Sequence, residues 1–160
     1  MQDTTQKIYP DTCIYIATIK LESKTTYCNL IFSKIKKYNK KVIVTDLQKS
    51  EIKGVSKSKK INYKTSKDGY EIIFGDYNHR IEIYTEENDK IIAKKISNKY
   101  FNRKHYNDCL HFQLAIKSKS NIIITDNTIH FDEIKDKFII EYNTGNNIEI
   151  IIPLEAIGII

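Results

Sequence analysis

Every apolar run in this chain is short. No segment approaches the roughly 18 consecutive apolar residues that a membrane-spanning helix needs, and the longest runs, such as residues 148–152 with Glu149 inside, have the length of a β-strand. Short apolar runs divided by polar turns are typical of a globular protein built from several small elements. The pattern excludes membrane-embedded, coiled-coil and collagen-like proteins, and the polar residues 1–10 show no signal-peptide pattern.

The first third of the chain predicts a strand, a helix and a second strand. Residues 13–21 (CIYIATIKL) carry apolar side chains at odd and even positions, which favours a strand buried on both faces. Ser23 can then cap a helix, whose apolar stripe recurs at three- and four-residue steps. That stripe consists of Tyr27, Leu30, Ile31, Ile35 and Tyr38. Residues 42–47 (VIVTDL) again predict a buried strand.

The middle of the chain favours antiparallel structure. Residues 48–67 are rich in Lys and Ser, which predicts a long loop or an exposed edge strand. Residues 70–74 and 80–84 predict a hairpin across Gly75-Asp76-Tyr77-Asn78. Residues 90–101 fit a helix or a strand, and the alternation of residues 110–116 predicts a half-buried strand.

The last forty residues predict a β-meander. Its strands are residues 121–125, 128–131, 137–142 and 148–152, after which Pro153 ends the ladder and residues 154–160 form a short turn or helix. No repeat or linker interrupts the 160 residues, so we expect one domain over 1–160, with a basic half (1–67) and a meander half (68–160). The predicted fold class is α+β, dominated by an antiparallel sheet.

The basic charge is concentrated in the first half. Residues 1–67 carry a net charge of +10 and residues 68–160 carry −4, and 24 of the 26 basic residues are Lys. The abundance of Ile (31), Asn (13) and Lys indicates an AT-rich genome, which accounts for Lys in place of Arg but not for the net charge of +6. A one-sided excess of this kind indicates an anionic partner or a solvated, Lys-rich face.

The function that this pattern favours is non-catalytic binding of nucleic acid or of a nucleoprotein complex. Lysines near phosphates release counterions and give affinity without sequence specificity, and an aromatic ring among them can stack on bases. The predicted contact residues are Lys34, Lys36, Lys37, Lys40, Lys41, Lys57, Lys59, Lys60, Lys64, Lys67 and Tyr63. The alternative is a protein-interaction module, an adaptor, inhibitor or assembly subunit, whose lysines steer an acidic protein partner. Neither partner is a membrane.

The sequence does not identify an active site. The five glycines allow neither a P-loop nor a dinucleotide-binding fingerprint. Asp46 ends a hydrophobic strand, where α/β enzymes place metal-binding acids, but a lone Asp there is usually a turn residue. No metal or cofactor is predicted, and a small enzyme remains a third alternative.

Two groups of residues contain histidines that could form a catalytic or metal site. His105, Cys109 and His111 match no zinc-finger spacing, and we expect a solvent-facing His beside a half-buried Cys. Thiol catalysis at Cys109 lacks a third, orienting group. His130 and Asp132 could form an acid–base pair, although polar pairs on an outer strand face are commoner.

Cysteine usage points to a reducing compartment. Cys13, Cys28 and Cys109 are odd in number and far apart. A disulfide framework is therefore not expected, and a cytoplasmic protein with free thiols is.

Overall fold

The structure is a computed structural model that describes residues 6–20, 23–65 and 67–160. Its centre is a five-stranded sheet in the order β3-β2-β1-β4-β5, and every neighbouring pair is parallel. The strands are β1 (Lys7–Pro10), β2 (Lys41–Thr45), β3 (Arg80–Ile83), β4 (Ile122–Ile124) and β5 (Glu149–Ile151). The predicted antiparallel α+β class is therefore wrong, and the fold is α/β.

The core consists of two hydrophobic clusters, one on each face of the sheet. In β1 and β2, side chains alternate between them: Ile8 and Val42 pack into one cluster, and Tyr9 and Ile43 pack into the other. Successive side chains of a strand point to opposite faces, so a sheet covered on both faces reads as a continuous apolar run. Parallel strands need crossover connections, which here are helices.

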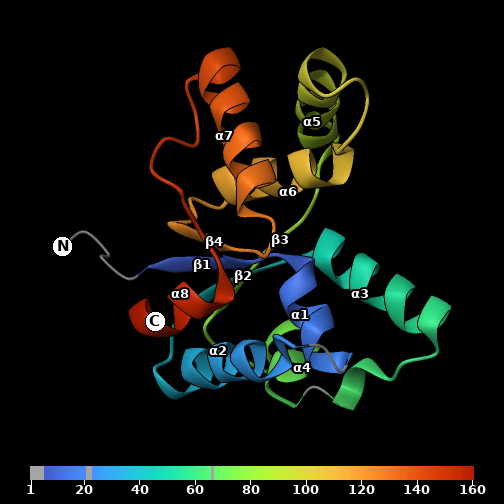
Figure 1. Cartoon of the computed structure of the whole chain (residues 1–160), viewed down its shortest axis with the longest axis vertical. Helices are drawn as coiled ribbons and strands as arrows, with labels where there is room; N and C mark the ends of the chain where they lie inside the picture. The colour runs from blue at the N-terminus through green and yellow to red at the C-terminus, as the bar shows by residue number, and fades with distance from the viewer. Residues whose placement is uncertain (1–5, 21–22, 66) are drawn as a thin grey trace.

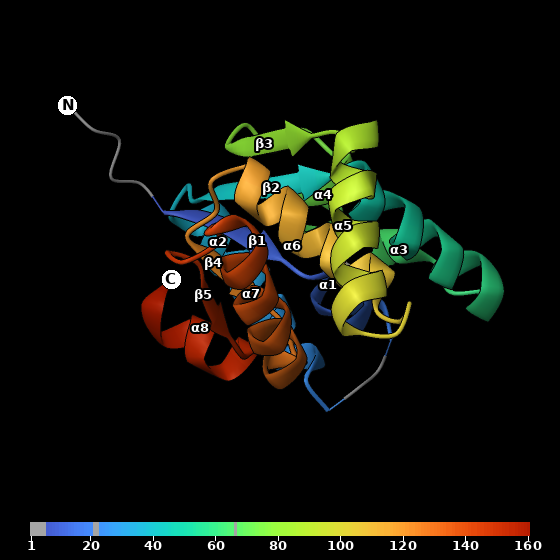
Figure 2. The same ribbon diagram turned by 90° about the horizontal axis from the view of Figure 1, so that it is seen from above.

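One face of the sheet is covered by five helices (Figure 1). They are α1 (Thr12–Ile19), α2 (Thr25–Lys37), α3 (Asp46–Lys59), α4 (Lys67–Phe74) and α8 (Pro153–Ile159), with a short 3-10 turn, η1 (Tyr63–Thr65), before α4. The other face is covered by α5 (Glu87–Tyr100), α6 (Tyr106–Lys117) and α7 (Thr128–Tyr142), as Figure 2 also shows. The sheet is thus the middle of three layers.

The predicted strand over residues 13–21 is wrong, because this segment is helix α1. Its buried residues fall at both parities because the helix lies between the sheet and α2, with Ile14 and Tyr15 in the core. Leu21, the end of the predicted strand, lies outside the described residues. Helix α2 is confirmed, although Lys24 rather than Ser23 precedes it and makes no side-chain cap.

The apolar stripe of α2 was only partly correct. Ile31 and Ile35 are buried, together with Cys28 and Phe32, which fill the gaps between them. The large side chains at the ends of the predicted stripe are exposed instead, namely Tyr27, Leu30 and Tyr38.

The predicted loop over residues 48–67 is also wrong. Residues up to Lys59 continue α3, η1 and α4 follow, and Ser66 lies outside the described residues. The apolar signal of α3 is faint because its buried residues are Gln48, Ile52 and Ser56, two of which are polar. Thr45 caps this helix, and with Gln48 it forms a capping box that was visible in the sequence.

The predicted hairpin and meander fail for one reason. Residues 70–74, 110–116, 128–131 and 137–142 lie in helices α4, α6 and α7, so strands β3, β4 and β5 have no antiparallel neighbours. The sequence of helix α6 resembles that of a strand because the helix is buried on most sides, between α5, α7 and the sheet, and therefore has few polar positions. The positions of β2, β3, β4 and β5 were predicted correctly, as was a short helix after Pro153.

Two simpler expectations can be compared with the structure directly. None of Cys13, Cys28 and Cys109 is in a disulfide, as expected from their number and spacing. Within the described residues, none of the helices combines the length and apolar character that crossing a bilayer requires.

Candidate active site at the carboxyl ends of the strands

The chain changes direction between β1 and β4. From β1 it builds outward through β2 to β3, and it then returns to place β4 and β5 on the other side of β1. In open α/β sheets, ligands bind at such a switch point, outside the carboxyl ends of the strands. Asp11 directly follows β1, and Thr125 directly follows β4.

Asp11 is fixed by three donors. Thr125 Oγ1 donates to its Oδ2 at 2.8 Å, the Cys13 thiol donates to the same oxygen at 3.3 Å, and the Thr12 amide donates to Oδ1 at 2.8 Å. The residue is 8% exposed and caps helix α1. A carboxylate held in this way is oriented before any ligand arrives.

Glu51 reaches the same place from helix α3. Its Oε1 accepts a hydrogen bond from Thr12 Oγ1 at 3.0 Å and contacts Nε2 of His111 on helix α6. The same imidazole nitrogen is 4.0 Å from Asp11 Oδ1, and the other ring nitrogen, Nδ1, shares a hydrogen bond of 2.6 Å with the buried Tyr9 hydroxyl.

His111 lies among carboxylates. Burial alone would lower the pKa of His111, but the carboxylates of Glu51, Asp11 and Asp108 outweigh that effect, so the pKa is raised. The expectation of a solvent-facing histidine holds for His105, which is exposed, but not for His111, whose ring is 1% exposed. Cys109 is fully buried, and burial raises its pKa to about 12, which excludes a thiolate nucleophile at neutral pH.

Asp108 lies one helical turn before His111 and completes an acidic cluster, which we define as Asp11, Glu51 and Asp108. Burial raises the pKa of Asp108, and the negative charge of Asp11 raises it further. The charges of His111 and His130 act in the opposite direction, and Glu51 adds a smaller repulsion. Carboxylates that are partly or fully removed from water in this way are suited to a divalent cation.

Two other acids at this edge have different roles. Asp126, after β4, forms an ion pair with Lys24. Asp46, considered above for metal binding, accepts hydrogen bonds from the Thr85 amide at 2.9 Å and the Thr85 hydroxyl at 2.8 Å. Asp46 therefore ties the start of α3 to the segment after β3, as a turn residue does.

The histidines have different neighbours from those that the sequence suggests. His105 lies beside Asp108 and His130, and across the part of the chain that the structure describes this is the only group of three ligand-bearing side chains within 4.8 Å of one another. His130 is 3.3 Å from Asp108, whereas Asp132 is exposed on α7. His130 therefore faces Asp108, and the strand expected to carry His130 and Asp132 is helix α7.

Several of the predicted lysines have partners within the protein. Lys36 forms ion pairs with Asp68 and Glu71, and the Lys34 ammonium donates to the carbonyl of Ile157 at 2.6 Å. Lys37 lies over the ring of its neighbour Tyr38. The exposed members of the set are Lys37, Lys57, Lys59, Lys60, Lys64 and Lys67, whereas Lys40 and Lys41 are half-buried.

Tyr63 is placed differently from a base-stacking residue. Its ring is half-buried and packs against Tyr70 at 5.8 Å and Phe74 at 5.0 Å between ring centroids. It thus contributes to an aromatic cluster beside the core.

The sequence reasoning missed all three members of the acidic cluster. The available signal was a repeated ending, because VIVT-Asp46 and IIIT-Asp126 both place Thr-Asp after an apolar run, and Asp11 also follows one. In a parallel sheet those endings lie along one edge. Glu51 and Asp108 gave no signal, since they reach the edge from helices.

Comparison with protein-family models finds no match, and comparison with curated proteins finds none either. Among solved structures, the chain is similar to one in the crystal structure of VapBC2 from Rickettsia felis bound to a DNA fragment from their promoter. The TM-score is 0.56 at 19% sequence identity, and the match covers 92% of this chain and 98% of that chain. This likeness shows a shared fold.

Proposed function

We propose that this protein cleaves phosphodiester bonds of a nucleic acid at the acidic cluster. The observation that carries the proposal is that Asp11 and Glu51 both approach His111 at the switch point of a parallel sheet, with Asp108 one helical turn before His111 and within the electrostatic influence of both acids. Carboxylates gathered at such a point bind the Mg²⁺ or Mn²⁺ ions that serve phosphoryl transfer.

The residues present fit a divalent cation by charge and by donor type. All three members of the cluster offer carboxylate oxygens, which hard cations prefer, and burial together with the charge of Asp11 raises the pKa of Asp108, so a cation beside it would relieve an unfavourable charge. A bound cation would polarise a phosphoryl oxygen and acidify a water molecule.

The surrounding residues orient the cluster. Thr125 and Thr12 hold Asp11 and Glu51 through their hydroxyls, and the His111 ring, fixed by Tyr9, holds the Glu51 carboxylate from the other side. Groups held by packing and hydrogen bonds need little reorganisation during a reaction.

A polyanionic substrate agrees with the charge of the chain. Lys57, Lys59 and Lys60 at the end of α3 are exposed, and no ion pair with an acidic side chain is seen for them within the described segments. With only two Arg in the chain, bidentate reading of guanine is not expected, so binding should tolerate many sequences. The neighbour of the same fold is described as a complex bound to promoter DNA, which supports the same class of substrate.

The test is cleavage of labelled single-stranded RNA and duplex DNA with Mg²⁺, Mn²⁺ or EDTA. We expect cation-dependent cleavage that falls at least 100-fold in Asp11→Asn and Asp108→Asn, about the loss that one removed transition-state contact produces. Asp136→Asn, an exposed acid on α7, is the matched control and should keep full activity. Cleavage that survives EDTA, or that is unchanged in Asp11→Asn, would contradict the proposal.

A second candidate function is binding of nucleic acid without cleavage, through the exposed lysines. It is favoured by the exposure of Lys57, Lys59 and Lys60, for which no ion pair is seen among the residues that the structure describes. Reversing all three to Glu should weaken binding, and it should reduce the salt dependence of affinity by about 2–3 in the log–log slope, since each phosphate contact contributes about 0.9. Salt-dependent binding without cleavage under either cation would favour this function over the first.

A further inference from the structure

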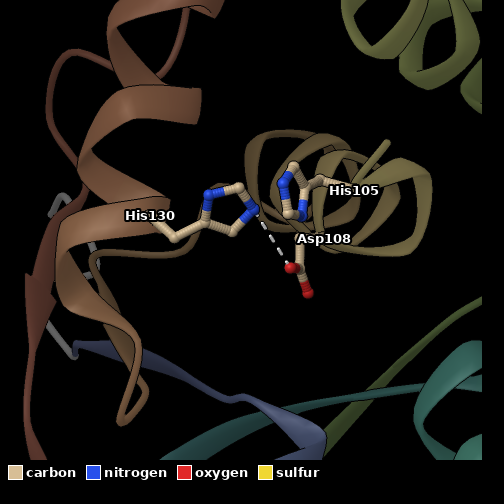
Figure 3. Close-up of side chains that lie close together, drawn as sticks. All are labelled: His105, Asp108 and His130. Atoms are coloured by element: carbon tan, nitrogen blue, oxygen red, sulfur yellow. Dashed lines mark ion pairs between the residues drawn. The ribbon is translucent and has the colours of Figure 1, made fainter. Parts of the chain in front are cut away.

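Three potential metal ligands face one another at the amino ends of α6 and α7 (Figure 3). His105 immediately precedes α6, Asp108 lies in the first turn of α6, and His130 lies in the first turn of α7. His105 is the N-cap of α6 and has a left-handed backbone conformation (φ 62°), and Asp108 follows three residues later in the first turn. The ligand atoms of the three side chains all lie within 4.8 Å of one another.

Nε2 of His130 lacks the partner that a buried nitrogen normally has. The atom is buried and, among the described residues, accepts and donates no hydrogen bond, although Asp108 Oδ2 is only 3.3 Å away. The two atoms are therefore in ion-pair range without hydrogen-bond geometry. Nearly all buried polar atoms are paired, so an unpaired nitrogen facing a carboxylate indicates a missing ligand.

The two imidazole rings are in close contact. Their centroids are 3.9 Å apart at an interplanar angle of 61°. Two imidazolium ions at this distance would repel, whereas two neutral rings present the nitrogen lone pairs that bind metals. The ring of Phe101 packs against both, at 5.9 Å from His105 and 5.8 Å from His130. This apolar side chain shields one side of the cluster from water, as the outer shell of a metal site does.

We propose that His105, Asp108 and His130 bind a Zn²⁺ ion with one coordination position left open. Two imidazoles and one carboxylate form a donor set that zinc accepts in sites with a free position, whereas Mg²⁺ prefers oxygen ligands alone. His105 is exposed, which gives the ion a path from solvent. The inference does not depend on the proposed cleavage, because ion binding is measured without nucleic acid.

The test is calorimetric titration of the untagged full chain with ZnCl₂. We expect one ion per chain and a rise in Tm on adding zinc, because an ion that binds only the folded state stabilises it. His105→Ala and His130→Ala should each weaken binding more than tenfold, since even the loss of an outer-shell partner reduces affinity 10–100-fold. His79→Ala, an exposed histidine beside Tyr77, is the matched control and should bind zinc as the wild type does.

A second measurement separates this site from its neighbours. Cobalt substitution should give a visible absorption spectrum that is present in the wild type and in Cys13→Ser and absent in His105→Ala. Because His105 is exposed, its variant should keep the wild-type fold, which far-UV circular dichroism in EDTA checks. Unchanged zinc affinity in His105→Ala, loss of binding in His111→Ala alone, or no binding by the wild type would each overturn the proposal.

Discussion

Gln48 connects the start of helix α3 to the end of the central strand. Its side-chain oxygen accepts a hydrogen bond from the Thr45 amide at 2.8 Å, and its side-chain nitrogen donates to the Pro10 carbonyl at 2.8 Å. The side chain is fully buried, so water cannot replace either bond. Pro10 precedes Asp11, and Glu51 lies one turn after Gln48, so this amide also sets the spacing of the acidic cluster. We predict that Gln48→Ala is strongly destabilising.

The magnitude follows from the two bonds. Loss of helix capping costs about 1 kcal/mol, and leaving a buried partner without its hydrogen bond costs about 1–3 kcal/mol. The sum is about 3 kcal/mol, which for a chain of this size lowers Tm by about 6–12 °C. Urea unfolding at pH 7, followed by far-UV circular dichroism, should show a lower midpoint with an unchanged slope.

Two further variants make the reasoning refutable. Lys49→Ala, the next residue, removes only a surface ion pair with Glu82 and should change stability by less than about 1 kcal/mol. Gln48→Glu keeps an acceptor for the Thr45 amide but places a carboxylate against the Pro10 carbonyl, so it should be as destabilising as Gln48→Ala. If Gln48→Ala unfolds within 0.5 kcal/mol of Lys49→Ala, taking about that value as the ordinary surface effect, the two bonds do not hold the site together.

Three other measurements test separate features. Gly145→Ala should destabilise the protein by about 1–3 kcal/mol, because the φ of Gly145 is +83° and a Cβ there would lie 2.7 Å from the Phe112 ring. Gly54→Ala is the contrasting variant: Gly54 lies inside helix α3 with open space around it, so the substitution should stabilise the protein by about 0.5–1 kcal/mol. The raised pKa of His111 means that its stabilisation is complete below its ordinary value of 6.5 and is lost as pH rises through the folded value. Unfolding titrations from about pH 6 to 9 should therefore show the wild type losing stability relative to His111→Gln. Asp108→Asn should stabilise the protein at pH 7 by about 0.5–2 kcal/mol, because burial and neighbouring acids disfavour the charged carboxylate, and under the proposed function it should also lose cleavage.

Four of the five strands were predicted at the correct positions, but the direction of each strand relative to its neighbours was not. The runs at 42–47, 80–84, 121–125 and 148–152 are strands β2, β3, β4 and β5. Whether two strands run parallel depends on what lies between them, and the intervening segments were assigned as strands or loops. The four residues of β1 were too short a run to stand out from the polar start of the chain.

The composition of the helices explains those assignments. With 31 isoleucines in the chain, β-branched residues occur in helices as well as strands, as in TCIYIATI of α1 and KFIIEY at the end of α7. Intrinsic preference disfavours such helices only slightly, and burial overrides it. Helix α3 was missed for the opposite reason, since only Ile52 of its three buried residues is apolar.

The candidate site could not be predicted from an antiparallel fold, and the reason is topological. An antiparallel meander scatters the ends of its strands over two edges, so Asp11 and Thr125 had no reason to meet. Once the strands are parallel, both residues fall at one edge, and the helices bring Glu51 and Asp108 to them. The sequence placed His105 beside Cys109 and His111 and indicated no site there, whereas in the structure its neighbours are Asp108 and His130.

The position of β1 in the middle of the sheet also affects when the site can exist. Asp11 and Thr125, which hydrogen bond to each other, are separated by 114 residues. At a translation rate of about 5–20 residues per second, Thr125 is made roughly 6–23 s after Asp11. During that interval β1 can pair with β2 alone, and its other edge remains open. The hydrogen bond from Thr125 that orients Asp11 therefore forms last, after Asp11, Glu51 and Asp108 have all been made.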